Sequence, residues 1–237
     1  MQHFIRRAAR CTLAAIFILP LATVQAQSTG APTYRAGLKS IAVPAPTSDF
    51  VELGPDYRVI LEPLAPDSNR LIAAFTLSDD AAALRSGAPS GMKQYALVEV
   101  MRRAEFSTIT PDIYKQIADA MATQFGATLD GSIKDAQDQL NRSLKVLSDN
   151  AATVSLDKPI QLGLLFSKAD ACGFGIIMPV SAKGDTIKMA AAVLVLRLQE
   201  RVVFVYLYKE YKDEASVRWV TQTAQAWADS ILAANKP

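Results

Sequence analysis

The hydrophobic pattern is most regular near the end of the chain, from Thr186 to Ala234. Two apolar runs there, Ile187 to Leu198 and Val202 to Tyr208, are separated by three polar residues, which is the spacing of a β-hairpin. After them, apolar residues recur every three or four positions, at Val217, Val220, Ala224, Trp227 and Ile231. Residues with this spacing share one face of a helix. The pattern therefore predicts a hairpin followed by an amphipathic helix whose apolar face covers the sheet.

Shorter apolar runs earlier in the chain predict the remaining strands. They are Tyr57 to Leu61, Arg70 to Leu77, Tyr95 to Met101, Ile160 to Phe166 and Phe174 to Val180. Turn-forming residues precede the second run, at Pro66-Asp67-Ser68-Asn69, and follow the last, at Ala182-Lys183-Gly184-Asp185. Residues 79–84 predict a helical turn, and residues 87–91 predict a loop.

Two helices are expected in the middle of the chain. Thr110-Pro111-Asp112 is typical of a helix start, because it combines a capping hydroxyl, proline at the first helical position and an acid near the positive end of the dipole. Its apolar face is Ile113, Ile117, Met121 and Phe125, and Gly126 then predicts the helix end. The second helix is expected from Ser132, with the stripe Ile133, Ala136, Leu140, Leu144 and Leu147.

The order of these elements predicts an α+β fold. About seven strands are expected, and the short turns between the last four require antiparallel neighbours. The helices form one block in the middle of the chain and one at its end, which differs from the alternation of βαβ proteins. The run Ile187 to Leu198 is apolar on both faces, so both faces of the sheet are expected to be covered. The expected architecture is therefore an α/β/α sandwich.

This order of elements resembles that of the Mog1/PsbP-like family of antiparallel α/β/α sandwiches. The resemblance depends on the closing strands from Cys172 to Tyr208 and on the helix from Asp213 to Ala234. The segment from Leu129 to Lys158 departs from the family pattern. Members of the family tend to be accessory or binding proteins, so the resemblance implies a similar role for this chain.

The beginning of the chain has the pattern of a secretory signal peptide, residues 1–26. A basic start with Arg6, Arg7 and Arg10 precedes thirteen mostly apolar residues, 12–24, and small residues stand before a cut after Ala26. An uncleaved membrane anchor is the alternative, although a span needs about 20 apolar residues. Residues 27–48 are predicted to be a Pro/Ala/Ser/Thr-rich linker, on which Tyr34, Leu38, Ile41 and Val43 are available for loose docking. Residues 49–237 are predicted to form a single α+β domain.

Removal of residues 1–26 changes the composition. Residues 1–26 contain three of the 25 basic residues, none of the 23 acidic residues and the only histidine, His3. The mature chain would therefore have 22 basic and 23 acidic residues, which gives a net charge of −1. Without a basic surplus, nucleic acid is not an expected partner. Without histidine, a Ser-His-Asp triad, a Cys-His pair and zinc bound through imidazole are excluded. The single remaining cysteine, Cys172, is expected to be a buried thiol, and no metal or other cofactor is expected.

Two other groups of residues carry possible chemistry. Ser148-Asp149-Asn150 and Ser155-Leu156-Asp157-Lys158 match two elements of the penicillin-binding signature. Their order is reversed, Lys183-Gly184-Asp185 is not the Lys-Thr-Gly element of that signature, and Pro159 disfavours a helix at Lys158, so the match is interpreted as chance. The carboxylate pairs Asp79-Asp80 and Asp213-Glu214 are interpreted as a turn cap and a helix start.

The expected partner surface lies where the last strand ends. It consists of Tyr208, Lys209, Tyr211 and Lys212, because tyrosine is enriched in recognition surfaces. Trp219 lies off the apolar stripe of its helix and is expected to add an exposed tryptophan. The alternatives are that the tyrosines fill a face of the sheet and that Trp219 packs under the linker.

Three functional hypotheses follow. The first is an exported, non-catalytic periplasmic protein that binds a protein or a small ligand, or assists assembly; the absence of a complete catalytic set favours it. The second is a histidine-free hydrolase that uses carboxylates or a Ser/Lys pair, which two convergent ionisable groups with perturbed pKa values would favour. The third is a domain tethered to the inner membrane by an uncleaved N-terminal helix.

Overall fold

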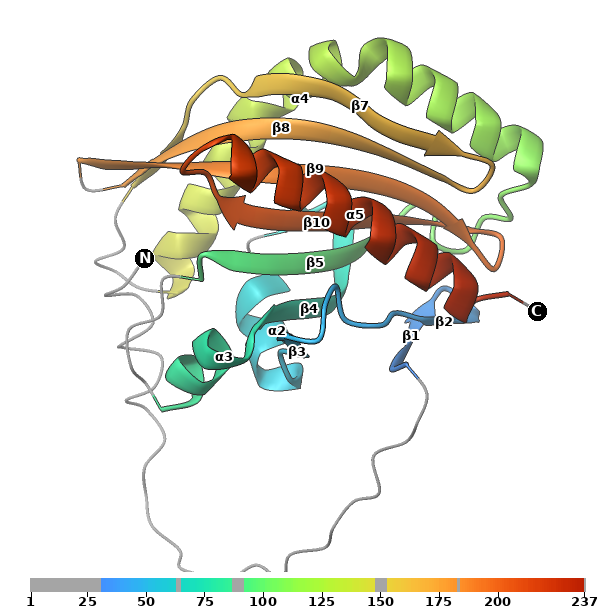
Figure 1. Ribbon diagram of the computed structural model, residues 1–237, viewed down its shortest axis with the longest axis horizontal. Helices are drawn as coiled ribbons and strands as arrows, with labels where there is room; N and C mark the ends of the chain where they lie inside the picture. Colours follow the sequence, from blue (N-terminus) through green and yellow to red (C-terminus); the bar gives the residue numbers. More distant parts are fainter. Residues whose placement is uncertain (1–30, 63–64, 87–91, 148–152, 183, 237) are drawn as a thin grey trace, which may run out of the picture.

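The structure is a computed structural model that describes residues 31–62, 65–86, 92–147, 153–182 and 184–236. Within these residues, eight strands form one antiparallel sheet and two further strands form a separate hairpin. One helix crosses one face of the sheet, and a longer helix lies behind the opposite face (Figure 1). The α+β class and the α/β/α arrangement predicted from the sequence are confirmed. The expected signal peptide and the expected loop 87–91 lie outside the described residues.

The strand order of the large sheet is β3-β4-β5-β10-β9-β8-β6, and β7 also pairs with β8. The strands are β3 (Phe50–Glu52), β4 (Asn69–Leu77), β5 (Gln94–Met101), β6 (Val154–Leu156), β7 (Ile160–Lys168), β8 (Ala171–Ala182), β9 (Asp185–Leu198) and β10 (Arg201–Glu210). The predicted runs coincide with β4, β5 and β7 to β10. β3 and β6 have three residues each, too few to show a hydrophobic pattern. Consecutive strands β8, β9 and β10 form the antiparallel meander that the short turns require.

The C-terminal helix α5 (Glu214–Ala234) covers one face of the sheet, the α5 face. It begins at Asp213, whose carboxylate accepts a hydrogen bond from the Ser216 N–H at 3.1 Å. The predicted stripe is confirmed, because Val220, Ala224, Trp227 and Ile231 are buried and Val217 packs at their margin. They share the main core with strand side chains of β4, β5, β9 and β10. The spacing of apolar residues in the sequence was therefore sufficient to predict that this helix covers the sheet.

The opposite face, the α4 face, is covered by α4 (Pro111–Leu147), a helix of 37 residues. Phe125 stacks on Phe174 of β8 with 4.6 Å between ring centroids. The buried Tyr114 donates a hydrogen bond from its hydroxyl to the carbonyl of Val195 at 2.8 Å. The first half of α4 is thereby fixed on β8 and β9 by both apolar and polar contacts.

Two predictions about helices are wrong. Helix α4 continues through Gly126, so the two expected helices are one; a glycine inside a helix costs about 1 kcal/mol, and it ends a helix only when it takes a left-handed conformation. The absent side chain of Gly126 instead makes room for Gln161 of β7. The run Tyr57 to Leu61 belongs to helix α2 (Pro55–Leu61) and not to a strand, because Pro55 and Asp56 form a favourable first turn.

Helices α2 and α3 (Ser78–Arg85) flank the other end of the sheet, and α3 contains the helical turn predicted over residues 79–84. Ala81 and Leu84 of α3 pack with Leu71 and Ala74 of β4 in a small separate core. Among the described helices, none is both long enough and apolar enough to cross a membrane.

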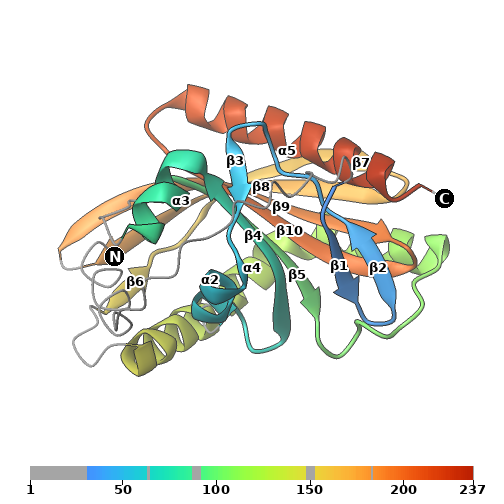
Figure 2. The same ribbon diagram turned by 90° about the horizontal axis from the view of Figure 1, so that it is seen from below.

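The segment predicted to be a linker, residues 27–48, contains a folded hairpin. Its strands β1 (Thr33–Ala36) and β2 (Lys39–Ala42) lie side by side (Figure 2). Gly37 joins them at a φ of +58°, and a Cβ there would clash with the Glu105 carbonyl oxygen. Tyr34, Ile41 and Val43 are buried in the main core, whereas Leu38 is exposed. The prediction of a loosely docked linker therefore differs from the structure, because one face of the hairpin is part of the core.

Helix α5 holds this hairpin in place. The side chain of Asn235 accepts a hydrogen bond from the Ala42 N–H at 2.9 Å and donates one to the Ala42 carbonyl at 2.7 Å. The Trp227 indole N–H donates to the Pro44 carbonyl at 2.7 Å. The two ends of the described chain are thus joined to each other.

Candidate functional site

The predicted partner surface does not contain an exposed tryptophan. Trp219 is half-buried on the α5 face, where its ring stacks on Phe50 with 6.4 Å between centroids. The Lys209 ammonium lies 4.6 Å from the centre of the same indole ring, which is a cation–π contact. Partial burial, together with the neighbouring charge of Lys212, lowers the pKa of Lys209. The position off the apolar stripe is explained by packing against Phe50, just after the predicted linker.

The other predicted surface residues are divided between two faces of the sheet. Tyr208 points to the α4 face, because successive strand residues alternate, and it packs against the core there. Tyr211 packs against the main core on the α5 face, and Lys212 is exposed before the helix. The structure therefore brings Trp219 and Lys209 together, places Tyr211 on the same face and separates Tyr208 from them.

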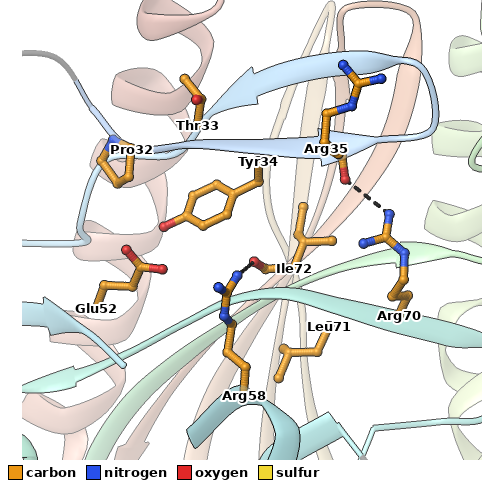
Figure 3. A pocket seen from close by; sticks show the side chains of 9 residues that line it. All are labelled: Pro32, Thr33, Tyr34, Arg35, Glu52, Arg58, Arg70, Leu71 and Ile72. Carbon is orange, nitrogen blue, oxygen red and sulfur yellow. Dashed lines mark hydrogen bonds between the residues drawn. The ribbon is translucent and has the colours of Figure 1, made fainter. Parts of the chain in front are cut away.

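A polar pocket opens between the N-terminal hairpin, α2 and β4. Its volume is about 360 Å³, near the lower end of the range of about 300–1,000 Å³ typical of small-molecule sites. Figure 3 shows the residues that line it, which are Pro32, Thr33, Tyr34, Arg35, Glu52, Arg58, Arg70, Leu71 and Ile72. We refer to it as the Tyr34 pocket. Sequence reasoning missed it because its walls are the segments interpreted as a linker and as a strand.

Tyr34 is the buried polar residue of this pocket. It is 8% exposed, and its buried hydroxyl makes no hydrogen bond of ordinary length and angle, although the Glu52 carboxylate lies close to it. The side chain extends into the pocket toward Glu52 (Figure 3). Burial, and then the negative charge of Glu52, raises the pKa of Tyr34, so the hydroxyl keeps its proton. A buried hydroxyl without a well-formed hydrogen bond is unfavourable, and a bound polar group would relieve that cost.

Two arginines reach the pocket from different elements. Arg58 of α2 donates from Nη1 to the carbonyl of Ile72 at 2.7 Å, and its guanidinium carbon lies 6.0 Å from the centre of the Tyr34 ring. Arg70 of β4 is paired with Glu105 at 2.7 Å and also donates to the Arg35 carbonyl at 3.0 Å. Arg70 thereby holds the hairpin against β4. A guanidinium has five N–H donors, so Arg58 retains donors for a further acceptor.

Glu52 supplies a negative charge to the same pocket. It lies on β3, where it pairs with Phe75 of β4, and it is exposed. Among the described residues, Glu52 forms no ion pair with Arg58, with Arg70 or with another arginine. A carboxylate and a guanidinium therefore face one cavity without forming an ion pair.

The signal in the sequence that marks this site is the alternation of Tyr34 and Ala36 before Gly37, which is the pattern of a half-buried strand.

A second group of ionisable side chains lies on the α4 face of β5 and β10. Glu99 is 2% exposed and accepts a hydrogen bond from Asn69 at 2.8 Å. Tyr95 and Tyr208 stack with 4.5 Å between centroids, and Tyr206 stacks on Tyr208 at 6.3 Å. Burial raises the pKa of all four groups. Burial therefore disfavours the ionised form of each of these groups.

Glu99 predicts a pH-dependent stability. An acid whose pKa is higher in the folded than in the unfolded state stabilises the fold below the unfolded pKa and loses that contribution as the pH rises through the folded pKa. We expect Glu99→Gln to raise the free energy of unfolding by about 1 kcal/mol near pH 8, where wild-type Glu99 bears the cost of ionisation, and to have no such effect near pH 4. Urea unfolding at both pH values measures this. Glu214→Gln, on a side chain that is 92% exposed, is the control, and an equal gain for both variants contradicts the burial explanation.

Cys172 is confirmed as a buried thiol, at 1% exposure in the core beneath α4. Burial raises its pKa, which further reduces its reactivity. We expect a thiol reagent not to modify the native protein and to modify one cysteine per mature chain in urea. A chain that keeps residues 1–26 also contains Cys11, so the reagent would modify two cysteines per chain in urea. Rapid modification of the native protein contradicts the burial of Cys172.

The proposed hydrolase elements are not assembled in the described part of the structure. Ser155 lies on β6, opposite Ser181, and not on a helical turn with Lys158. Asp79 and Asp80 lie in the first turn of α3, where the helix dipole favours acids, but the helix is capped at Leu77 without a side-chain cap hydrogen bond, so the turn-cap interpretation is wrong. The residues Ser148-Asp149-Asn150 and Lys183 lie outside the described residues. Within the described chain, no three histidine, cysteine or acidic side chains form a group that would hold a metal ion.

Comparison with known proteins gives no sequence match and one distant structural likeness. No family model matches the sequence, and no curated protein matches it. The structure is similar to that of the Ran-binding protein Mog1p of Saccharomyces cerevisiae, with 12% sequence identity and a TM-score of 0.32 over 80% of this chain and 87% of that one. The resemblance to the Mog1/PsbP-like fold noted in the sequence is thus found again in the structure, as a distant likeness of fold.

Proposed function

We propose that the mature protein is an exported, non-catalytic binding protein, and that a small polar molecule binds in the Tyr34 pocket. The observation that carries this proposal is the buried Tyr34 hydroxyl at the edge of the pocket, which makes no hydrogen bond of ordinary length and angle. Natural proteins leave few buried polar groups unpaired unless a ligand, an ion or water completes them.

The remaining pocket residues support the same function. Arg58 is oriented by its bond to the Ile72 carbonyl and Arg70 by its pairing with Glu105. Charged groups held in this way lose little side-chain entropy on binding. Leu71 and Ile72 also line the pocket, so a small apolar surface accompanies the polar groups, and polar groups that converge on one cavity are typical of a ligand site.

The two rival hypotheses have less support. A hydrolase needs a nucleophile or base, and burial shifts the pKa of Glu99 and of Tyr206 in the direction that disfavours their ionised forms. Export depends on the signal-like residues 1–26, and the thiol count of Cys172 and Cys11 described above distinguishes the cleaved chain from a membrane-tethered one.

Native mass spectrometry of protein purified from the periplasm tests the binding proposal. We expect a small-molecule adduct on the wild-type protein and at least about a tenfold smaller fraction of it on Arg58→Gln. Arg218→Gln, at an exposed arginine on α5, is the matched control and should keep the adduct. An adduct of equal occupancy on all three proteins, or none on any, contradicts the proposal.

A further inference from the structure

We infer that the ligand of the Tyr34 pocket is a small zwitterion, a molecule that carries one carboxylate and one ammonium group, such as an amino acid or a dipeptide. This inference rests on the proposed function and adds the chemical class of the ligand. The juxtaposition behind it is a guanidinium and a carboxylate, Arg58 and Glu52, which line one cavity without forming an ion pair, with the Tyr34 side chain beside them (Figure 3).

The positive wall is suited to a carboxylate. Arg58 uses one nitrogen, Nη1, for the Ile72 carbonyl, and this bond fixes the plane of the guanidinium. Arginine binds carboxylates with two parallel N–H donors when its plane is held. Arg70 is less available, because Nε and Nη2 both donate to Glu105, at 3.1 and 2.7 Å. Arg58 is therefore the residue that we expect to bind the acid group.

The negative wall is suited to an ammonium group. Glu52 is a carboxylate that makes no ion pair with the arginines of the pocket. A ligand with only a carboxylate would place its charge in the same cavity as that of Glu52, and a ligand with only an ammonium group would face Arg58 without compensation. Like charges in one site oppose each other. A zwitterion satisfies both walls with one molecule.

The Tyr34 hydroxyl adds a neutral donor and acceptor beside the two charges. It can donate to a carboxylate oxygen or accept from an ammonium hydrogen, and burial makes either bond stronger than in water. The cavity volume of about 360 Å³ fits a ligand of a few residues at most, since drug-sized sites reach about 1,000 Å³.

Calorimetric titration with four matched probes tests the inference. The probes are L-alanyl-L-alanine, its N-acetyl derivative, its C-terminal amide and the doubly capped form, and the protein is first unfolded and refolded to remove any co-purified molecule. We expect the uncapped dipeptide to bind and each singly capped form to bind roughly ten- to hundredfold more weakly, because each loses one charge-assisted contact.

Two variants assign the contacts. Glu52→Gln should abolish the preference for the free amine over the N-acetyl form, and Arg58→Gln should abolish the preference for the free acid over the amide. Glu214→Gln and Arg218→Gln, both on the exposed side of α5, should retain both preferences. Circular dichroism confirms that each variant is folded, and Tyr34→Phe, which removes only the hydroxyl, is the variant least able to disturb the fold.

The outcomes separate this inference from the proposed function. If the N-acetyl or amide form binds as tightly as the free dipeptide, or if none of the four probes binds, the zwitterion class is wrong. In both of these cases the binding proposal still stands if Arg58→Gln loses the adduct seen on the wild-type protein. The mass of that adduct then identifies the chemical class of the ligand. Absence of the adduct from the wild-type protein overturns both.

Discussion

Replacing Trp227 by alanine is expected to lower the free energy of unfolding by about 3–5 kcal/mol. The side chain is 1% exposed, it meets Phe75 edge to face with 6.0 Å between ring centroids, and its indole N–H is bonded to the Pro44 carbonyl. The substitution therefore opens a cavity between α5 and the sheet and leaves a carbonyl without its donor. Urea unfolding followed by far-ultraviolet circular dichroism measures the loss.

Trp219→Ala is the matched control for this prediction. Trp219 lies on the same helix but is half-buried, with contacts to Phe50 and Lys209 at one edge of the core. We expect it to cost about 1–2 kcal/mol. Equal losses for the two variants would show that the helix does not rest on the sheet through the stripe that contains Trp227.

A chain that begins at Asp49 is expected not to fold cooperatively. It lacks the hairpin of β1 and β2 and with it the buried side chains of Tyr34, Ile41 and Val43. Large core residues contribute about 2–5 kcal/mol each, and three of them together approach the total stability of about 5–15 kcal/mol of an ordinary domain. A chain that begins at Ala31 keeps the hairpin and is expected to unfold like the mature protein.

The measurement is the urea midpoint of both chains. A chain starting at Asp49 with an unchanged midpoint would restore the interpretation of residues 27–48 as a linker. Asn235→Ala tests the same junction without a deletion, since it removes only the bonds to Ala42 and to the Ile231 carbonyl. We expect it to cost about 1–3 kcal/mol.

The elements that the sequence predicted correctly are those whose partners are near in the chain. The run Ile187 to Leu198 and the stripe ending at Ile231 have long, regular periods, and short turns impose the antiparallel order of β8, β9 and β10. Cys172 was placed correctly for a similar reason, because it stands at the start of an apolar strand with no activating group beside it.

The elements that the sequence did not predict depend on contacts with distant residues. Tyr34 and Ile41 lie in short runs, and only packing against the distant helix α5 shows that they belong to the core. The run from Tyr57 is apolar enough for a strand, but Pro55 sets a helix start before it. The Tyr34 pocket combines both of these segments with β3 and β4, so no local pattern contains it. The split of the expected surface follows from strand alternation, which sends Tyr208 and Lys209 to opposite faces.

The bonds from Asn235 to Ala42 impose an order on biosynthesis. Ala42 ends the hairpin that forms one wall of the Tyr34 pocket, and Asn235 is separated from it by 193 positions. The hairpin therefore cannot acquire these two bonds during translation until Asn235 has left the ribosome. Before that point the bond from Arg70 and the contacts with the sheet core are available to hold it.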